Sequence, residues 1–224
     1  MKTLFIAEIG LNHLGDIRTL NQYLKFLLAS KVDGITIQIL KDSFYIGKYK
    51  KFKINSKQIK NFINKIKNKK KLVGIVTDDI KKIKFLRKLK IDFYKVLSSN
   101  IYDLELINKL IRTNCKYVFL STGLVNNFEL NKILKRIEKK KISLIHTSFK
   151  KNRSQINLRR INMLKKKFKL PVSYGNHSKF LGSLREAHKY KPNAIFFYVK
   201  TKKKANFPDN IHAIKLNKIK NYIY

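Results

Sequence analysis

The stretch Leu4-Phe5-Ile6-Ala7-Glu8-Ile9 is a short apolar run that contains a single carboxylate, and it sets the pattern for the rest of the chain. A run that is continuously apolar, rather than alternating, is typical of a parallel strand buried on both faces. Seven more runs of this kind follow it, at Gly34–Ile39, Leu72–Val76, Phe93–Leu97, Tyr117–Leu120, Ile142–His146, Pro171–Tyr174 and Ala194–Val199.

The segments between these runs have the spacing of amphipathic helices. Leu20, Tyr23, Leu24 and Leu27, for example, fall on one face of a helix. Eight strands that alternate with helices over about 200 residues predict an α/β fold, a single-domain (β/α)8 TIM barrel. An open doubly wound sheet is the alternative, but eight sequential units and the lack of a Gly-x-Gly-x-x-Gly turn argue against it.

The domain organisation follows from the same pattern. We expect residues 1–199 to form the barrel and residues 200–224 to form a basic C-terminal tail that packs on it. A short helix is predicted at Leu216–Tyr222, within this tail. The longest insertion, Lys41–Ser56, follows the second predicted strand. We expect no second domain.

The composition is strongly basic, with 52 Lys and Arg against 13 Asp and Glu, a formal net charge of +39 over 224 residues. A polyanion-binding protein is one interpretation of this charge. However, only 8 of the basic residues are Arg, the usual reader of phosphates and base edges, so the composition does not favour a nucleic acid partner. No stretch approaches the roughly 20 apolar residues of a membrane helix, and the single Cys115 allows no internal disulfide. We expect a cytoplasmic protein without membrane contact.

Polar residues gather where the predicted strands end. In a barrel the carboxyl ends of the strands meet at one face, and the functional groups of such enzymes lie there. This rule predicts a pocket built from Glu8, Asn12, His13, Gln38, Thr77, Lys95, Ser98, Ser121, His146 and His177.

Two of these residues lie within apolar strands and therefore indicate chemistry. Glu8 is a buried carboxylate, which must be paired or perturbed, and this makes it a candidate acid/base. Lys95 either forms a Schiff base, as in an aldolase, or pairs with an anionic substrate. The hydroxyls of Ser98 and Ser121 beside it suit a phosphate or a carboxylate. His177 can bind a metal ion or transfer protons.

Six motifs, in the same order, resemble those of the sialic acid (N-acetylneuraminate) synthase family. The first, Ile6-Ala7-Glu8-Ile9-Gly10-Leu11-Asn12-His13-Leu14-Gly15-Asp16, is the most specific. The others are Asp33-Gly34-Ile35-Thr36-Ile37-Gln38, Tyr94-Lys95-Val96-Leu97-Ser98-Ser99, Leu120-Ser121-Thr122-Gly123, Ile145-His146-Thr147-Ser148 and Tyr174-Gly175-Asn176-His177-Ser178. Pro208-Asp209-Asn210 is similar to the family's closing motif.

This resemblance implies an enzyme that condenses phosphoenolpyruvate with an N-acetylated hexose to a nonulosonic acid, in carbohydrate biosynthesis. It implies that Glu8 is the acid/base and that Lys95, Ser98 and Ser121, with Thr77, hold phosphoenolpyruvate. His177 would be one of two His ligands of a divalent metal, Mn or Mg. Further pocket residues would be Asn12, His13, Gln38, His146 and Asp209. A homodimer is the assembly that the resemblance suggests.

The sequence also departs from the family pattern. Thr36 stands where the family has a phosphate-binding Lys, and Tyr198 stands at the position of the second metal-binding His, which weakens the metal site. Asn210 replaces the closing His, although His212 lies two residues further on. The family's small C-terminal antifreeze-like domain is not expected here. A non-catalytic barrel that binds a phosphorylated or carboxylated metabolite is therefore the alternative function.

Overall fold

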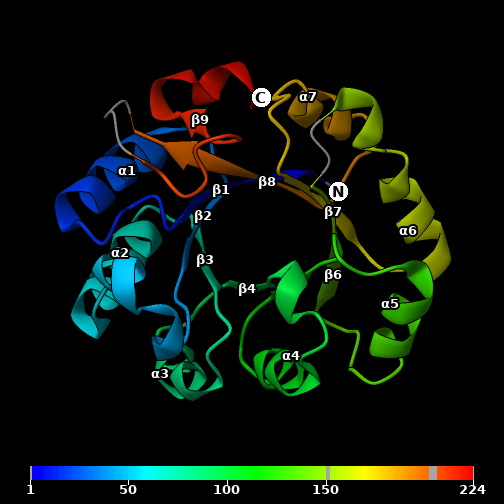
Figure 1. Cartoon of the computed structure of the whole chain (residues 1–224), viewed down its shortest axis with the longest axis horizontal. Helices are drawn as coiled ribbons and strands as arrows, with labels where there is room; N and C mark the ends of the chain where they lie inside the picture. The colour runs from blue at the N-terminus through cyan, green and yellow to red at the C-terminus, as the bar shows by residue number, and fades with distance from the viewer. Residues whose placement is uncertain (1, 150–151, 202–205, 224) are drawn as a thin grey trace.

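The computed structural model describes residues 2–149, 152–201 and 206–223. The predicted tail 200–224 therefore lies partly outside the described residues. The strands form a closed parallel barrel in chain order, in which the eighth strand also pairs with the first (Figure 1). The predicted (β/α)8 barrel is confirmed. The barrel strands are β1 Leu4–Gly10, β2 Gly34–Gln38, β3 Leu72–Val76, β4 Phe93–Val96, β5 Tyr117–Ser121, β6 Ile142–Ser148, β7 Val172–Asn176 and β8 Ala194–Lys200.

The helices lie outside the barrel and follow the predicted order. Asp103 and Asn126 cap α4 and α5 by accepting hydrogen bonds from backbone N–H groups of the first turn. Asp16 and Asn55 do the same for α1 and α2. The α-helices are α1 Ile17–Ala29, α2 Ser56–Asn68, α3 Ile83–Arg87, α4 Leu104–Ile111, α5 Asn127–Leu134, α6 Arg160–Phe168 and α7 Ser183–His188. The insertion after β2 forms the 3₁₀ helices η1 Asp42–Phe44 and η2 Gly47–Phe52. Three more 3₁₀ helices follow β3, β4 and β6, respectively: η3 Ile80–Lys82, η4 Ser98–Asn100 and η5 Arg153–Gln155.

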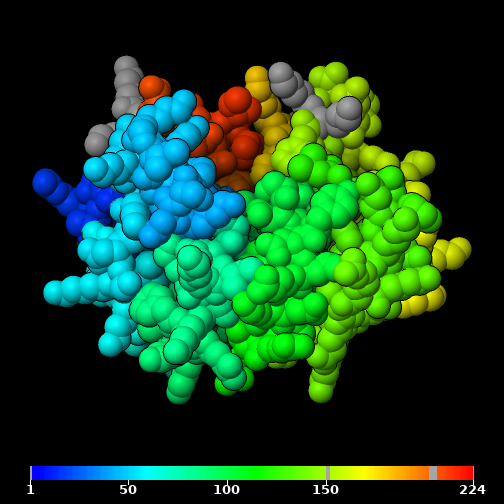
Figure 2. All heavy atoms as spheres, turned by 60° about the horizontal axis from the view of Figure 1, so that its bottom comes forward, coloured from blue at the N-terminus to red at the C-terminus, as the bar shows by residue number. Residues whose placement is uncertain are grey.

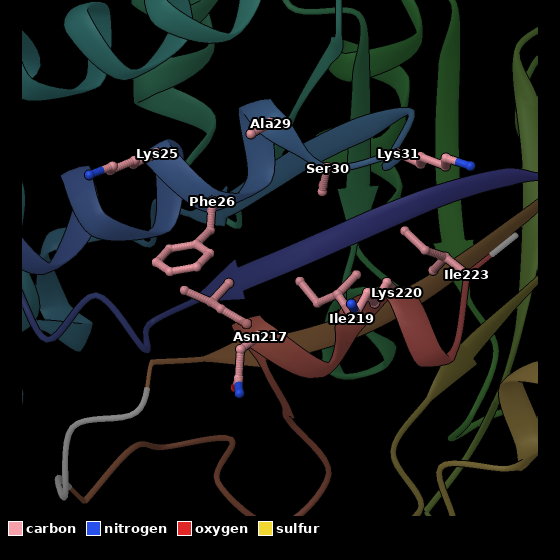
Figure 3. Close-up of a pocket in the computed structure, with 10 residues that line it drawn as sticks. Lys25, Phe26, Ala29, Ser30, Lys31, Asn217, Ile219, Lys220 and Ile223 are labelled. Carbon is pink, nitrogen blue, oxygen red and sulfur yellow. The ribbon is translucent and has the colours of Figure 1, made fainter.

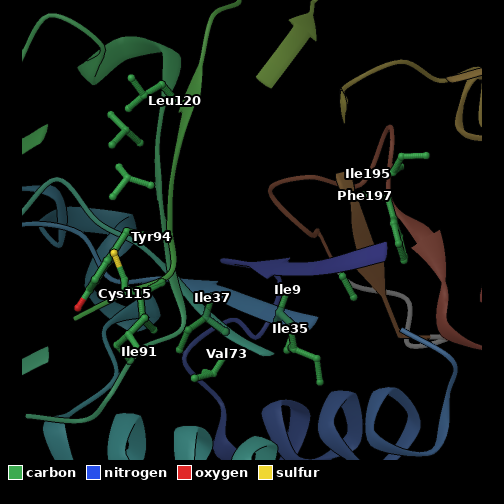
Figure 4. Close-up of a cluster of buried hydrophobic side chains, with 14 of the residues drawn as sticks. Ile9, Ile35, Ile37, Val73, Ile91, Tyr94, Cys115, Leu120, Ile195 and Phe197 are labelled. Atoms are coloured by element: carbon green, nitrogen blue, oxygen red, sulfur yellow. The ribbon is translucent and has the colours of Figure 1, made fainter. Parts of the chain in front are cut away.

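The barrel has two apolar layers. The larger one lies between strands and helices and includes Ile35, Tyr94, Phe197 and the buried thiol of Cys115 (Figure 4). The smaller one fills the barrel interior with Ile6, Phe93, Phe119, Ile145, Ala194 and Phe196. Because side chains of a strand alternate between its two faces, the residues two positions further along these strands also point into the barrel. These residues are Glu8, Lys95, Ser121, Thr147 and Tyr198.

The C-terminal segment packs against the barrel beside its first and last strands. Strand β9, Ile214–Lys215, pairs in parallel with the end of β8, and the 3₁₀ helix η6, Leu216–Asn221, packs against α1. The predicted short helix is thus present as a 3₁₀ helix. A groove of about 790 Å³ lies between α1 and η6, with Phe26 on one side and Ile219 on the other (Figure 3). This groove is outside the barrel and shares no residue with the predicted site.

Part of the C-terminal segment lies over the same end of the barrel as the insertion after β2. In the space-filling view, orange and red atoms of this segment lie between the cyan insertion and the green half of the molecule (Figure 2). Among the described residues, no helix is long and apolar enough to cross a membrane.

Candidate functional site

Glu8 and Lys95 meet inside the barrel as a buried ion pair. The Lys95 Nζ donates to Glu8 Oε1 at 2.5 Å and to Oε2 at 2.8 Å, and the two side chains are 1% and 2% exposed. The ammonium also lies over the rings of Phe196 and Tyr198, with Nζ 5.3 and 5.7 Å from their centroids. The predicted acid/base and the predicted anion-binding cation are therefore direct partners, and each charge compensates the other in a buried site.

The three hydroxyls predicted for the site differ in the hydrogen bonds that they already make. Ser121 follows Phe119 on the inner face of β5, and its Oγ is buried without a hydrogen-bond partner. Ser98 Oγ accepts the Gly123 N–H at 3.2 Å, so this hydroxyl keeps its proton available for donation. Thr77 Oγ1 accepts the Asp79 N–H at 3.1 Å and thereby shapes the turn after β3. Ser121 and Ser98 are the hydroxyls best placed to donate to an anion.

A cluster of aromatic and imidazole rings adjoins the pair, beginning with the Tyr198 ring beneath Lys95. His177 follows β7, and its ring centroid is 5.5 Å from that of Tyr198 and 4.9 Å from that of His212. Burial, and then the charge of Lys95, lower the pKa of His177 to about 2 and that of His212 to about 4. Both imidazoles are therefore neutral at neutral pH, which is the form that binds metal ions.

Asp209 completes this cluster from the C-terminal segment. Burial, and then the charge of Glu8, raise the pKa of Asp209 to about 7. Its Oδ1 lies 3.7 Å from His212 Nε2. Gly10 makes room for it, since a Cβ at this position, whose φ is +57°, would lie 3.0 Å from Asp209 Oδ2 and 2.8 Å from the Tyr198 ring.

Asn12 supports the site without contacting its ionised pair. Its Nδ2 donates to the Val199 carbonyl at 2.9 Å, and its Oδ1 accepts the Asp209 N–H at 3.1 Å. Asn12 thus ties the loop after β1 to the end of β8 and fixes the backbone at Asp209. Gln38 ends β2 beside Val76, at the same end of the barrel.

His146 is not brought into this cluster. Ile145 points into the barrel, so the next side chain points outward, where the His146 ring hydrogen-bonds the Ile156 carbonyl through Nε2 at 2.9 Å and packs on Tyr174. It lines a separate groove of about 440 Å³, beside Arg160. The predicted substrate-binding role of His146 therefore has no geometric support in this conformation.

The sequence reasoning missed a contribution from His212 and from Phe149. Phe149 packs edge-on against His177, with ring centroids 5.1 Å apart. No spacing in the sequence relates these residues to His177, because they come from loops that only the closed barrel brings together. The nearness of His212 to the Pro208-Asp209-Asn210 motif was the one available signal.

The side chains of this cluster supply two of the ligands that a metal ion needs. In the part of the chain that the structure describes, no group of three or more His, Cys, Asp or Glu side chains is arranged to hold one. However, the neutral rings of His177 and His212 are adjacent, and His212 Nε2 is buried without a hydrogen-bond partner. Two imidazoles can hold an ion whose other ligands are water or substrate.

The buried, neutral ring of His13 leads us to expect that the protein loses stability in acid. Its Nδ1 accepts the Gly15 N–H at 3.0 Å, which requires a neutral ring, and burial lowers its pKa to about 4 from 6.5. A lowered pKa contributes stability that is present above the unfolded value and is lost as pH falls toward the folded value. When the pH falls from about 7 to about 5, the burial of His13 should lower the unfolding free energy by about 2 kcal/mol.

Urea unfolding of the wild type and of His13→Gln at both pH values measures this contribution. The Gln oxygen can still accept from Gly15, but it does not titrate, so the variant should lose less stability in acid. An identical loss in both proteins would contradict the assignment. His146→Gln is a parallel variant, because burial also lowers the pKa of His146 to about 4.

Comparison with known proteins places this barrel in a family. The sequence model of the NeuB family matches residues 30–223. The chain belongs to the NeuB family. This confirms the resemblance to sialic acid synthases that the six ordered motifs indicated.

Two curated relatives are similar to this NeuB-family chain. N,N'-diacetyllegionaminic acid synthase of Campylobacter jejuni is 26% identical over 208 residues, covering 80% of this chain and 61% of the relative. An uncharacterised protein of Methanocaldococcus jannaschii is 30% identical over 192 residues, covering 79% of this chain and 56% of the relative. The chain thus spans about three fifths of the length of these relatives.

Solved structures agree on the fold. The sialic acid synthetase of Leptospira borgpetersenii, in complex with citrate, superposes with a TM-score of 0.90 at 21% identity, covering 99% of this chain and 81% of that one. The spore coat polysaccharide biosynthesis protein spsE of Bacillus subtilis gives a TM-score of 0.86 at 17% identity, covering 99% of this chain and 66% of that one. At these identities the likeness shows the barrel fold alone.

Proposed function

We propose that this NeuB-family barrel condenses phosphoenolpyruvate with an N-acetylated hexose to form a nonulosonic acid and release phosphate, as a step in surface polysaccharide biosynthesis. The observation that carries the proposal is the convergence of Glu8, Lys95 and the unpartnered Ser121 hydroxyl inside the barrel. The similarity to a legionaminic acid synthase supports the same class of acceptor.

Lys95 and the two serines would hold the anionic groups of phosphoenolpyruvate. An ammonium has three N–H donors, so Lys95 can bind a phosphate or carboxylate oxygen while it keeps a contact to Glu8. Ser121 and Ser98 add hydroxyl donors, and hydrogen bonds to an ionised acceptor are the stronger kind. The formal charge of +39 would raise the local concentration of such an anion.

Glu8 would transfer the protons. The new bond joins C3 of phosphoenolpyruvate to the aldehyde carbon of the sugar, and a water adds to C2 before phosphate leaves. Glu8 would take the proton of this water and return a proton to the alkoxide formed from the aldehyde oxygen, so that protons balance over the cycle. Its ion pair with Lys95 fixes the carboxylate for this task.

A divalent ion, Mn or Mg, held by His177, would polarise the aldehyde carbonyl of the acceptor. His177 lies on the side of the Glu8–Lys95 pair where Tyr198 and Phe149 form aromatic walls. These rings would limit the access of water to the acceptor aldehyde, and exclusion of water strengthens electrostatic interactions in the site.

The test is an activity assay on the purified chain. We expect phosphate release when phosphoenolpyruvate, Mn²⁺ and an N-acetylated hexose such as N-acetylmannosamine are all present, and none when the sugar is omitted. Mass spectrometry should show a product with the mass of the sugar plus pyruvate. Thermal stabilisation by phosphoenolpyruvate without turnover on any of several acceptors would instead support the non-catalytic, metabolite-binding barrel.

A further inference from the structure

The C-terminal segment places a second imidazole beside the one that follows β7. His212 precedes β9, and its ring centroid lies 4.9 Å from that of His177, with 43° between the ring planes. With metal–nitrogen distances of about 2.1 Å, two imidazoles on one ion have centroids roughly 4.6 Å apart at a right angle and roughly 5.3 Å apart at a tetrahedral angle. The observed separation lies within this range.

His212 also has an unsatisfied nitrogen. Its Nε2 is buried without a hydrogen-bond partner, although the Asp209 carboxylate is only 3.7 Å away. A buried polar atom without a partner is costly, and native proteins rarely leave one without a reason. A cation beside Nε2 would satisfy this nitrogen and would lie close to the Asp209 carboxylate.

The side chains of the cluster are of the kinds that bind a cation. Glu8 and Lys95 compensate each other, so they add little net charge. No lysine or arginine among the described residues pairs with Asp209, whose backbone is held in place by Asn12. The cluster thus places a carboxylate without a Lys or Arg partner beside the His212 imidazole, and imidazole nitrogens and carboxylate oxygens are ligands of divalent transition metals.

We propose that His212, supplied by the C-terminal segment, is the second imidazole ligand of the divalent metal ion that His177 binds, with Asp209 as the neighbouring carboxylate. This assignment rests on the proposed function for the presence of a metal, but it concerns binding and not turnover. It makes the metal a link between the barrel and the segment that follows β8. Tyr198, whose ring centroid is 4.9 Å from that of His212, forms a wall of the site.

Metal binding by the full chain, measured without substrates, tests the proposal. Titration with Co²⁺ followed by visible absorption, and with Mn²⁺ followed by calorimetry, should give one site per chain. We expect His177→Ala and His212→Ala each to weaken binding at least about 10-fold, since each removes one of two imidazole ligands. Asp209→Asn should weaken it less. His188→Asn is the matched control, because His188 packs on Phe5 in a different part of the barrel.

Two further measurements keep the test decisive. Circular dichroism verifies that each variant is folded, and His212→Asn replaces His212→Ala should the latter unfold. Pulsed electron paramagnetic resonance on the Mn²⁺ complex should count two imidazole nitrogens in the wild type and one in the His212 variant. Unchanged binding in a folded His212 variant, or no metal binding by the wild type, would overturn the proposal. Because no phosphoenolpyruvate is present, either result is distinct from a failure of the synthase assay.

Discussion

Glu8→Gln should abolish most product formation while the protein still binds phosphoenolpyruvate. The amide keeps the shape of the carboxylate and can still accept a hydrogen bond from Lys95, but it cannot take a proton from water. Loss of a positioned acid/base costs typically about 10²–10⁴-fold in rate. We therefore expect kcat to fall by about that factor in the phosphate-release assay.

Although kcat falls, the binding of phosphoenolpyruvate should not weaken. Without the Glu8 carboxylate, the Lys95 ammonium is no longer neutralised and is free to pair with the phosphate, so phosphoenolpyruvate should stabilise the variant against heat at least as strongly as it stabilises the wild type. Glu105→Gln is the control, because this Glu pairs with Lys109 on the exposed face of α4 and should leave both readouts unchanged. A Glu8→Gln enzyme with a tenth or more of the wild-type kcat would refute the acid/base role.

The barrel fold could be predicted from the sequence because each strand leaves a local signal. Runs such as Leu72–Val76 match the observed strand to the residue, and others differ by one or two residues at the ends. The helix caps Asp103 and Asn126 are local in the same way, since Asp and Asn favour this position wherever the helix lies in the fold. None of these features depends on contacts between distant parts of the chain.

The site was predictable only in part. Glu8 and Lys95 stand out because a charge within an apolar strand needs a partner, and the alternation of side chains directs both into the barrel. The same alternation sends His146 outward, and the sequence reasoning did not apply it there. His212 could not be assigned, because its place beside His177 results from the packing of the C-terminal segment on β8 rather than from any local pattern.

Lys95→Met should be among the most destabilising single substitutions in the protein. Met has a similar length and suits an apolar site, but it leaves the Glu8 carboxylate at 1% exposure with no cation. Removal of one partner of a buried ion pair costs about 3–5 kcal/mol, because the remaining charge is left uncompensated. We expect a loss of this size in the unfolding free energy from urea denaturation, and the loss of stabilisation by phosphoenolpyruvate.

The double variant Glu8→Gln/Lys95→Met separates the two contributions. It removes both charges, so most of the lost stability should return, whereas the stabilisation by phosphoenolpyruvate should not. Lys109→Met makes the same substitution in an exposed pair with Glu105, where the expected change is below about 1 kcal/mol. A Lys95→Met protein as stable as the Lys109→Met control would mean that Glu8 is not held as a buried charge, and the double variant would then show no recovery.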